Sequence, residues 1–315
     1  MSITDLNEDW IGCLYSPLRT PVPASDRTAA VWYTHLVKTF TRSDIWLIGL
    51  LSLALGCVRQ PPPPPPPPPV PLDVQQWQQR DDFAALREAL SLTEAALQTE
   101  PGHRDLLARM VHGYVFIAEY HAQTEAQRMD ALDEAVAWGE RCLSMNADFA
   151  TLRMKTRESA ASAARVLTLD DAPCTFWMAV ALDERARRSG LSTRLQLAPI
   201  VVAYLSQATE LDPNAFYGGP DRRWGIHYAN LPQGAGQDLD RARQHFDRAL
   251  SIAPTYLPNH LALAQHWAVL SEDDAAVQQA LDTVLNAAPD ENPQTRPENR
   301  AAKQRASLMK ERIAP

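Results

Sequence analysis

The chain has 315 residues, a formal net charge of −8 and 22% charged residues, which fits one or two globular domains. An acidic chain lacks the clustered lysines and arginines that displace counterions from nucleic acid, so no nucleic-acid partner is expected. Only 12 glycines are present, while Ala, Leu, Gln, Glu and Arg are abundant. This composition favours helices and argues against collagen-like and repetitive β folds.

The first 36 residues contain Pro17, Pro21 and Pro23 and show no helical periodicity. The features of a targeting signal begin only after them. We therefore expect translation to start at Leu36 or Val37, from an alternative start codon, so that residues 1–36 are unstructured or are not made.

Residues 45–55 form the only long uncharged apolar run. It is too short for a membrane-spanning helix, which needs roughly 20 residues, but it matches the apolar part of a signal peptide. The basic residues Lys38 and Arg42 precede it, and a small residue followed by Cys57 ends it. This arrangement resembles a bacterial lipobox, in which the cysteine takes a diacylglycerol. It predicts a lipoprotein signal peptide over residues 37–57 and a lipid anchor on Cys57.

The alternative is a short buried helix in which Cys57 is merely a small hydrophobic residue. The segment after Cys57 disfavours this alternative, because residues 61–69 are all proline and cannot continue a packed core. This run should form an extended polyproline II helix of roughly 28 Å. Residues 58–72 are therefore interpreted as a stiff tether, the rival being a ligand for an SH3-like module. Val58 stands after the cysteine, where an aspartate would favour inner-membrane retention, so the outer membrane is expected.

Residues 73–315 carry apolar residues at helical spacings of three and four, interrupted by Pro, Gly or Asn roughly every 15 to 20 residues. This is the rhythm of stacked helical hairpins. Since one hairpin buries only one face, neighbouring hairpins should share a contiguous core. The predicted fold is all-α, an irregular TPR-like helical-hairpin solenoid of about eleven helices. Its last helix, residues 297–313, is highly charged and should cap the array.

The clearest hairpin lies in residues 224–254. Its second helix carries two small residues, an aromatic residue and a final proline, namely Ala242, Phe246, Ala249 and Pro254. Small residues let two helices approach closely, the ring fills the groove between them, and proline ends the helix. The first helix carries Trp224, Gly225 and Tyr228, the large–small–aromatic pattern of a tetratricopeptide (TPR) repeat.

Motifs for known chemistry are missing from the sequence. No HExxH, GxSxG, Walker A or GxGxxG pattern occurs. His260 and His266 are six residues apart and fall on opposite sides of a helix, so they do not form a chelating pair. We expect no catalytic residues, no metal ligands and no cofactor, and therefore no enzymatic activity.

Two pairs of residues have structural interpretations. Cys142 and Cys174 either form a disulfide in an oxidising compartment or remain free buried thiols. Asp170 and Asp171 stand at an expected helix start, where carboxylates accept hydrogen bonds from free backbone N–H groups.

One segment combines aromatic residues, two arginines and a Gly-Gly turn. Its candidate binding residues for a ligand or partner are Phe216, Tyr217, Arg222, Arg223, Trp224, His227 and Tyr228. Such residues can line a pocket for an organic acid, with an arginine forking onto its carboxylate. In the alternative interpretation, Trp224 and Tyr228 belong to the core of the hairpin and the two arginines face solvent.

Four stretches together, residues 210–220, 224–232, 240–250 and 297–303, resemble the TRAP transporter T-component (TatT-like) family. The resemblance covers roughly residues 75–315. It implies a lipid-anchored periplasmic TPR-type protein that associates with the solute-binding (P-component) protein of a tripartite transporter. It also implies assembly as a homotrimer with a hydrophobic cleft or pore.

The resemblance and the lipobox agree on a membrane-anchored periplasmic lipoprotein. The expected function is a non-enzymatic scaffold that binds the solute-binding protein, or a small hydrophobic or organic-acid ligand. The alternative is an outer-membrane TPR lipoprotein that acts as a scaffold for envelope assembly.

Overall fold

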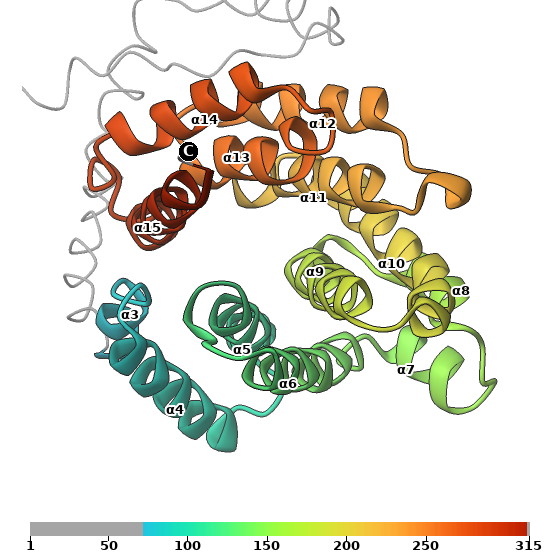
Figure 1. The fold of residues 1–315 in the computed structure, drawn as a ribbon. Coiled ribbons are helices and arrows are strands. Elements are labelled where there is room, and N and C mark those ends of the chain that lie inside the picture. The colour runs from blue at the N-terminus through green and yellow to red at the C-terminus, as the bar shows by residue number, and fades with distance from the viewer. Residues whose placement is uncertain (1–71, 314–315) are drawn as a thin grey trace, which may run out of the picture. The chain divides into compact units, whose positions relative to one another are not determined.

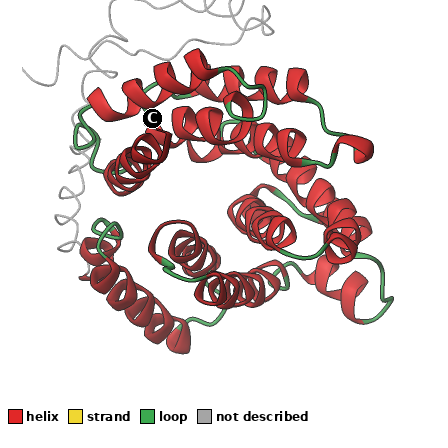
Figure 2. Cartoon of the chain, in the orientation of Figure 1, coloured by secondary structure: helices red, strands yellow, loops and turns green. Residues whose placement is uncertain are grey.

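The structure is a computed structural model that describes residues 72–313. The expected signal peptide, the Cys57 anchor and nearly all of the proline-rich tether lie outside the described residues. Within them, every regular element is helical and no strand occurs (Figure 2). The all-α solenoid-like class is therefore confirmed, with thirteen α-helices in the described part rather than about eleven.

The helices of the first half pack as successive hairpins along the chain (Figure 1). They are α3 (Leu72–Trp77), α4 (Phe83–Thr99), α5 (Arg104–Phe116), η1 (Ile117–His121), α6 (Glu125–Leu143), α7 (Ala147–Met154), α8 (Ala160–Ala163), η2 (Ala164–Val166), η3 (Leu169–Asp171) and α9 (Ala172–Arg188). The short helices α7 and α8 between α6 and α9 account for part of the excess over the predicted number.

The second half continues the arrangement, and α11 packs on α12 as α9 packs on α10. Its elements are α10 (Leu191–Leu211), α11 (Ala215–Asn230), η4 (Gln233–Ala235), α12 (Leu239–Ile252), α13 (Leu257–Ala262), η5 (Leu263–Ala268), α14 (Asp274–Asn286) and α15 (Arg296–Ile313).

The hairpin of α11 and α12 packs as its residue pattern predicts. Ala242, Phe246 and Ala249 are completely buried. A Cβ atom added to Gly225 would lie 2.9 Å from the Phe246 ring, closer than carbon atoms normally approach. Glycine is therefore required there to let the two helices meet.

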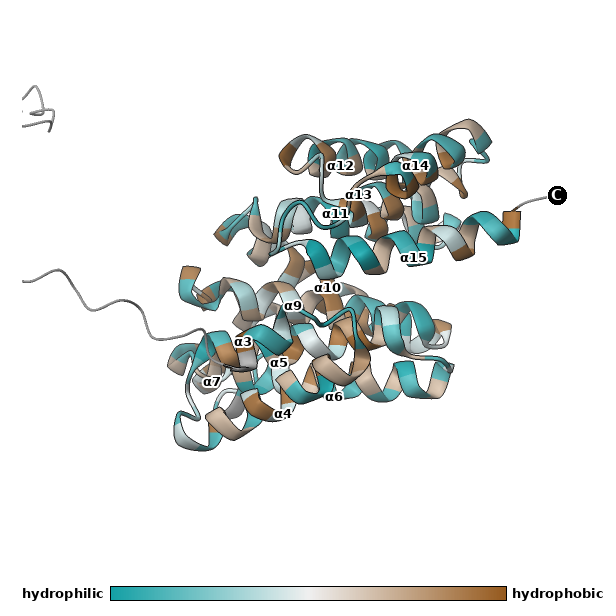
Figure 3. Ribbon diagram, turned by 90° about the vertical axis from the view of Figure 1, so that its left-hand side faces the viewer, coloured by the Kyte–Doolittle hydropathy of each residue, from teal (hydrophilic) through white to brown (hydrophobic). Residues whose placement is uncertain are grey.

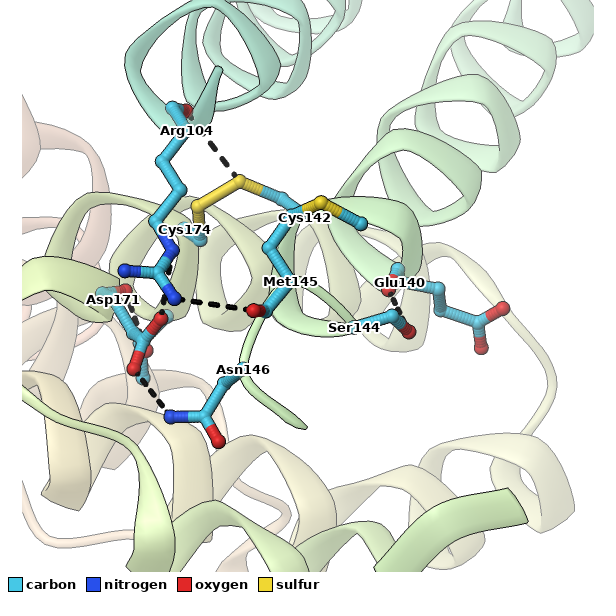
Figure 4. Close-up of a disulfide and its surroundings, with 9 residues drawn as sticks. Arg104, Glu140, Cys142, Ser144, Met145, Asn146, Asp171 and Cys174 are labelled. Atoms are coloured by element: carbon cyan, nitrogen blue, oxygen red, sulfur yellow. Dashed lines mark hydrogen bonds and ion pairs between the residues drawn. A yellow bond between two sulfur atoms is a disulfide. The ribbon is translucent and has the colours of Figure 1, made fainter. Parts of the chain in front are cut away.

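A disulfide joins Cys142 in α6 to Cys174 in α9, with their Cα atoms 5.9 Å apart. Of the two alternatives that the sequence left open, the structure has the disulfide (Figure 4). The bond fixes α9 against α6, and α9 carries several of the charged residues described below.

Asp171 lies beside the disulfide and is completely buried. Its carboxylate accepts a hydrogen bond from the Thr168 backbone N–H at 2.9 Å, as expected for a residue at a helix start. It also accepts a hydrogen bond from the Asn146 amide at 2.7 Å and lies 3.4 Å from the Arg104 guanidinium (Figure 4). The predicted capping role is confirmed for Asp171, which forms a capping box with Thr168 at the start of η3, but no side-chain cap occurs at the start of α9. The ion pair joins the buried carboxylate to a guanidinium side chain that is 33% exposed.

The last helix, α15, returns to the N-terminal helices (Figure 1). Arg80, between α3 and α4, donates through Nε to Glu298 Oε1 at 2.8 Å and through Nη2 to Oε2 at 2.5 Å. Both residues are buried, and His112 Nε2 of α5 lies 3.4 Å from the same carboxylate. The helix predicted to cap one end of the array thus connects the two ends.

The composition of α15 matches this position between two surfaces. Its residues are mainly hydrophilic along the helix (Figure 3). Its small residues Ala302 and Ala306 are completely buried against α13 and α14. In residues 72–313, no helix combines the length and the apolar content needed to cross a membrane.

Replacing Cys174 by alanine should lower the free energy of unfolding of the oxidised protein by about 3–4 kcal/mol. The reason is that the disulfide closes a loop of 32 residues and so restricts the unfolded chain. Urea denaturation with and without reductant measures the effect. Reduced wild-type protein is the control and should match the variant, and a wild type that is insensitive to reductant would contradict the disulfide.

Replacing Arg80 by methionine should lower the free energy of unfolding by about 3–5 kcal/mol, because it leaves the Glu298 charge buried without its partner. The double variant Arg80→Met/Glu298→Met should recover most of this loss. Lys310→Met, which breaks an exposed ion pair with Asp282, is the matched control and should cost less than about 1 kcal/mol. Equal costs for Arg80→Met and Lys310→Met in urea denaturation would argue against the connecting role of the buried pair.

Candidate functional site

The described helices surround a cavity of about 920 Å³. This volume lies within the range of small-molecule sites, about 300–1,000 Å³. Residues of α5, η1, α6, α9, α11, α13, η5 and α15 line it, so the wall combines parts of the chain that are distant in sequence. The cavity depends on the return of α15, which supplies one of its sides.

Part of the wall is apolar. It includes Val115, Phe116, Trp177, Ile226 and Leu261, all of which are buried. The ring of Trp177 stacks on that of His112, with their centroids 3.8 Å apart. This part of the wall offers a surface for the hydrocarbon body of a ligand.

The rest of the wall is charged, with seven arginines and three glutamates among the lining residues. Glu184 of α9 is at the centre of an ion-pair network. It accepts a hydrogen bond from Arg223 Nη1 at 2.8 Å, contacts Arg188 Nη1 at 3.2 Å, and also pairs with Arg187. Arg223 forms a second ion pair with Glu119 of η1. The network thus connects η1, α9 and α11.

The pKa values of this network follow from its contacts. Burial alone would raise the pKa of Glu184, but Arg187, Arg223 and Arg188 hold it well below its ordinary value. Burial alone would lower the pKa of Arg223, but Glu119 and Glu184 raise it. Each of these groups is therefore charged near neutral pH and compensated by a neighbour.

Arg222 and Arg305 also line the cavity, but outside this network. Arg222 Nη1 donates to the Asn259 side-chain oxygen at 2.8 Å, and Arg305 donates to the backbone carbonyl of Glu119. In the part of the chain that the structure describes, neither guanidinium forms an ion pair with a carboxylate.

The two histidines of the wall add no positive charge near neutral pH. Burial lowers the pKa of His112, against the opposing effect of Glu298. Burial and the neighbouring Arg187 lower the pKa of His266 to about 3. The charge of the cavity is therefore set by its arginines and glutamates.

The structure separates the candidate residues predicted from the sequence. Arg222 and Arg223 are each only 5% exposed and line the cavity, so the alternative that they face solvent is wrong. His227 lines a separate small cavity of about 20 Å³, with Nδ1 3.4 Å from Asp183 Oδ1. Trp224 and Tyr228 stack on each other, with ring centroids 5.5 Å apart, and do not line the large cavity.

Phe216 and Tyr217 shape the start of α11. Both have left-handed backbone angles, φ 51° and 61°, and Gly218 continues the kink with φ 75°. Phe216 stacks on Phe176, with ring centroids 4.7 Å apart, and so packs in the core. The side-chain amide of Asn259 donates to the Tyr217 carbonyl at 3.1 Å, which fixes the kink just before Arg222. Left-handed non-glycine residues are costly and need such support.

Sequence reasoning missed most of the charged wall, including Glu119, Glu184, Arg187, Glu298 and Arg305. One signal was available in α9: its buried apolar residues 176–182 lead directly to Glu184 and Arg187, so the sequence places charged side chains next to a buried stretch of the same helix. The others lie on helices distant in sequence. No cluster of three or more His, Cys, Asp or Glu side chains in residues 72–313 is arranged to hold a metal ion.

The chain is similar to a known protein family. The sequence model of a family described as TRAP transporter T-component matches residues 83–314, which is nearly the whole described unit and includes every helix that lines the cavity. No curated protein matches the chain.

The acid sensitivity of the fold should depend on Glu298. Burial alone raises its pKa, but Arg80 and His112 lower it to about 2, below the ordinary 4.5. Because the folded-state pKa is lower than the unfolded one, the ionised group stabilises the fold fully above pH 4.5, and this contribution is lost as the pH falls toward 2. Urea denaturation should show wild type more stable than Glu298→Gln at about pH 6 and a much smaller difference at about pH 3. A difference that does not change with pH would contradict this assignment.

Proposed function

Because the chain belongs to the TRAP transporter T-component family, we propose that it associates with the solute-binding protein of a tripartite transporter as a membrane-anchored accessory protein. The observation that carries the proposal is the family match over residues 83–314. A TRAP transporter accessory role follows from the family itself, and the solute-binding protein is the partner proposed here.

We place the protein on the periplasmic side of a bacterial membrane, held by a lipid on Cys57 after removal of the signal peptide that precedes it. The proline-rich residues 58–72 then act as a stiff spacer between the lipid and the helical unit. Two observations support this location. The apolar run before Cys57 has the length of the apolar part of a signal peptide. The Cys142–Cys174 disulfide is of a kind that persists in oxidising compartments such as the periplasm.

The proposed mode of action is binding without catalysis. The helical hairpins act as a TPR-type scaffold, an assignment supported by the packing of Gly225 against Phe246. The outer surface binds the solute-binding protein, and homotrimer assembly is the arrangement that the family suggests. The cavity binds a small hydrophobic or organic-acid ligand, and Arg222 and Arg223 contribute to this site. The neighbouring aromatic residues set the conformation of the α11 segment that carries the two arginines.

Affinity purification tests the partner. The tagged chain, solubilised from membranes of its native cell, should retain the solute-binding protein encoded near a large membrane permease. Retention is expected because accessory proteins of this family act with the transporter. Mass spectrometry of the retained proteins and fractionation of the cells provide the two readouts.

The matched control is Cys57→Ala, which should move the protein from the membrane to the soluble fraction and still retain the partner. Failure to retain any solute-binding protein would reject the transport role. Retention of envelope-assembly subunits instead would favour an outer-membrane scaffold for envelope assembly.

A further inference from the structure

The cavity wall contains more positive than negative charge. Seven arginines and three glutamates line it, and its two histidines have lowered pKa values. The glutamates are already used, since Glu184 and Glu119 pair with Arg223 and Glu298 pairs with Arg80. Arg187 also pairs with Asp183, and Arg128 and Arg188 pair with Glu125, two carboxylates that do not line the cavity. The positive charge left for a group that enters the cavity therefore belongs to the lining arginines outside these pairs, Arg222 and Arg305 among them.

Arg222 is the clearest source of this excess. It is 5% exposed, and the hydrogen bond to Asn259 is its only one to the described residues. Its guanidinium carbon also lies 5.2 Å from the centroid of the Tyr256 ring. A guanidinium has five N–H donors and does not lose its proton in proteins, so most of its donors are unused. A buried charge without a counterion is costly, and a bound anion removes that cost.

Arg305 supplies a second cation from α15. Its partner is the backbone carbonyl of Glu119, which carries no net charge, and its guanidinium carbon lies 5.9 Å from the centroid of the Tyr120 ring. Tyr120 lies near both cations and near the Glu119 carboxylate: burial and Glu119 raise its pKa, while Arg305 and Arg222 lower it.

Two phenols complete this end of the cavity. Tyr120 and Tyr256 line it, and neither hydroxyl has a hydrogen-bond partner among residues 72–313. Burial raises the pKa of both groups, so both remain protonated and able to donate. Two guanidinium groups and two hydroxyls, all donors, therefore line the same cavity without a charged acceptor of their own, since the nearby carboxylates of Glu119 and Glu298 are paired with Arg223 and Arg80.

The apolar part of the wall favours a hydrocarbon group, in contrast to the arginines, which favour an anion. Besides the buried residues named above, Val269, Leu308 and Ile313 line the cavity while remaining 47%, 49% and 41% exposed. Exposed apolar side chains beside an open cavity favour a ligand with a hydrocarbon body. A fully polar anion would leave these surfaces in contact with water.

We propose that the cavity binds an amphiphilic organic carboxylate, with its head group between Arg222 and Arg305 and its apolar body against Phe116, Leu261 and Leu308. A carboxylate presents two oxygens that match the planar fork of a guanidinium. The inference rests on the proposed ligand-binding role of the cavity and specifies the chemical class of the ligand. It also gives Tyr120 and Tyr256 the role of additional donors to the head group.

Isothermal titration calorimetry of the 315-residue chain with decanoate, kept below its micelle concentration, tests the inference. Wild-type protein should bind decanoate, and decanol, which has the same chain without the charge, should bind about tenfold or more weakly. Acetate, which has the charge without the chain, should also bind about tenfold or more weakly. Equal binding of decanoate and decanol would overturn the proposal.

Two substitutions locate the head group. Arg222→Gln and Arg305→Gln should each weaken decanoate binding about tenfold or more, because each removes a cation. Arg165→Gln changes an exposed arginine that does not line the cavity, and it should bind decanoate as wild type does. Wild-type affinity in both cavity variants would overturn the proposal.

Thermal unfolding followed by circular dichroism checks that each variant folds. If Arg222→Gln is unfolded, Arg305→Gln and Tyr256→Phe carry the test, since the latter keeps the ring and removes only the hydroxyl. Arginine-dependent decanoate binding by a protein that retains no solute-binding protein would uphold this inference and reject the proposed partner. Retention of the solute-binding protein with no decanoate binding would uphold the proposed partner and reject this inference.

Discussion

The buried ion pair between Arg80 and Glu298 holds the last helix against the first helices of the described unit. Without it, α15 would pack mainly on α13 and α14 and would keep the hydrogen bond from Arg305 to the Glu119 carbonyl, while one wall of the cavity would lose its buried link to the first helices. Removing two charges from water is costly, so such a pair is favourable only with good geometry and additional partners. Glu298 has both, since it accepts two hydrogen bonds from one guanidinium and lies beside His112.

Because a buried charge is costly unless it is paired, the charges of the cavity fall into two groups: those with a partner of opposite charge and those without one. Arg187, Arg188 and Arg223 surround Glu184 and form a closed network that joins three elements. Arg222 and Arg305 have only uncharged partners. A fold selected only for stability would replace such cations by apolar side chains. Their presence beside the apolar part of the wall, outside the paired network, points to a ligand. The strained backbone at Phe216 and Tyr217 likewise marks a segment shaped for its position.

Much of the fold could be predicted from the sequence because its helices are specified locally. Ala242, Phe246 and Ala249 are spaced so that they share one helix face, and that face is buried as predicted. Asp171 stands at a helix start and caps it. The Cys142–Cys174 pair was only one of two alternatives, because a disulfide requires that two distant Cα atoms lie within about 7 Å, and spacing along the chain does not fix that distance.

The sequence by itself determined the helical class, the hairpin of α11 and α12, the family and the candidate arginines Arg222 and Arg223. These depend on residue spacing within a helix or a hairpin. Only the tertiary structure decided that α15 returns to Arg80, that Glu119, Glu184 and Arg305 face one cavity, and that Trp224 and Tyr228 do not. The physical reason is that the charge balance of a cavity is a sum over helices distant in sequence, and no local pattern records which of them meet.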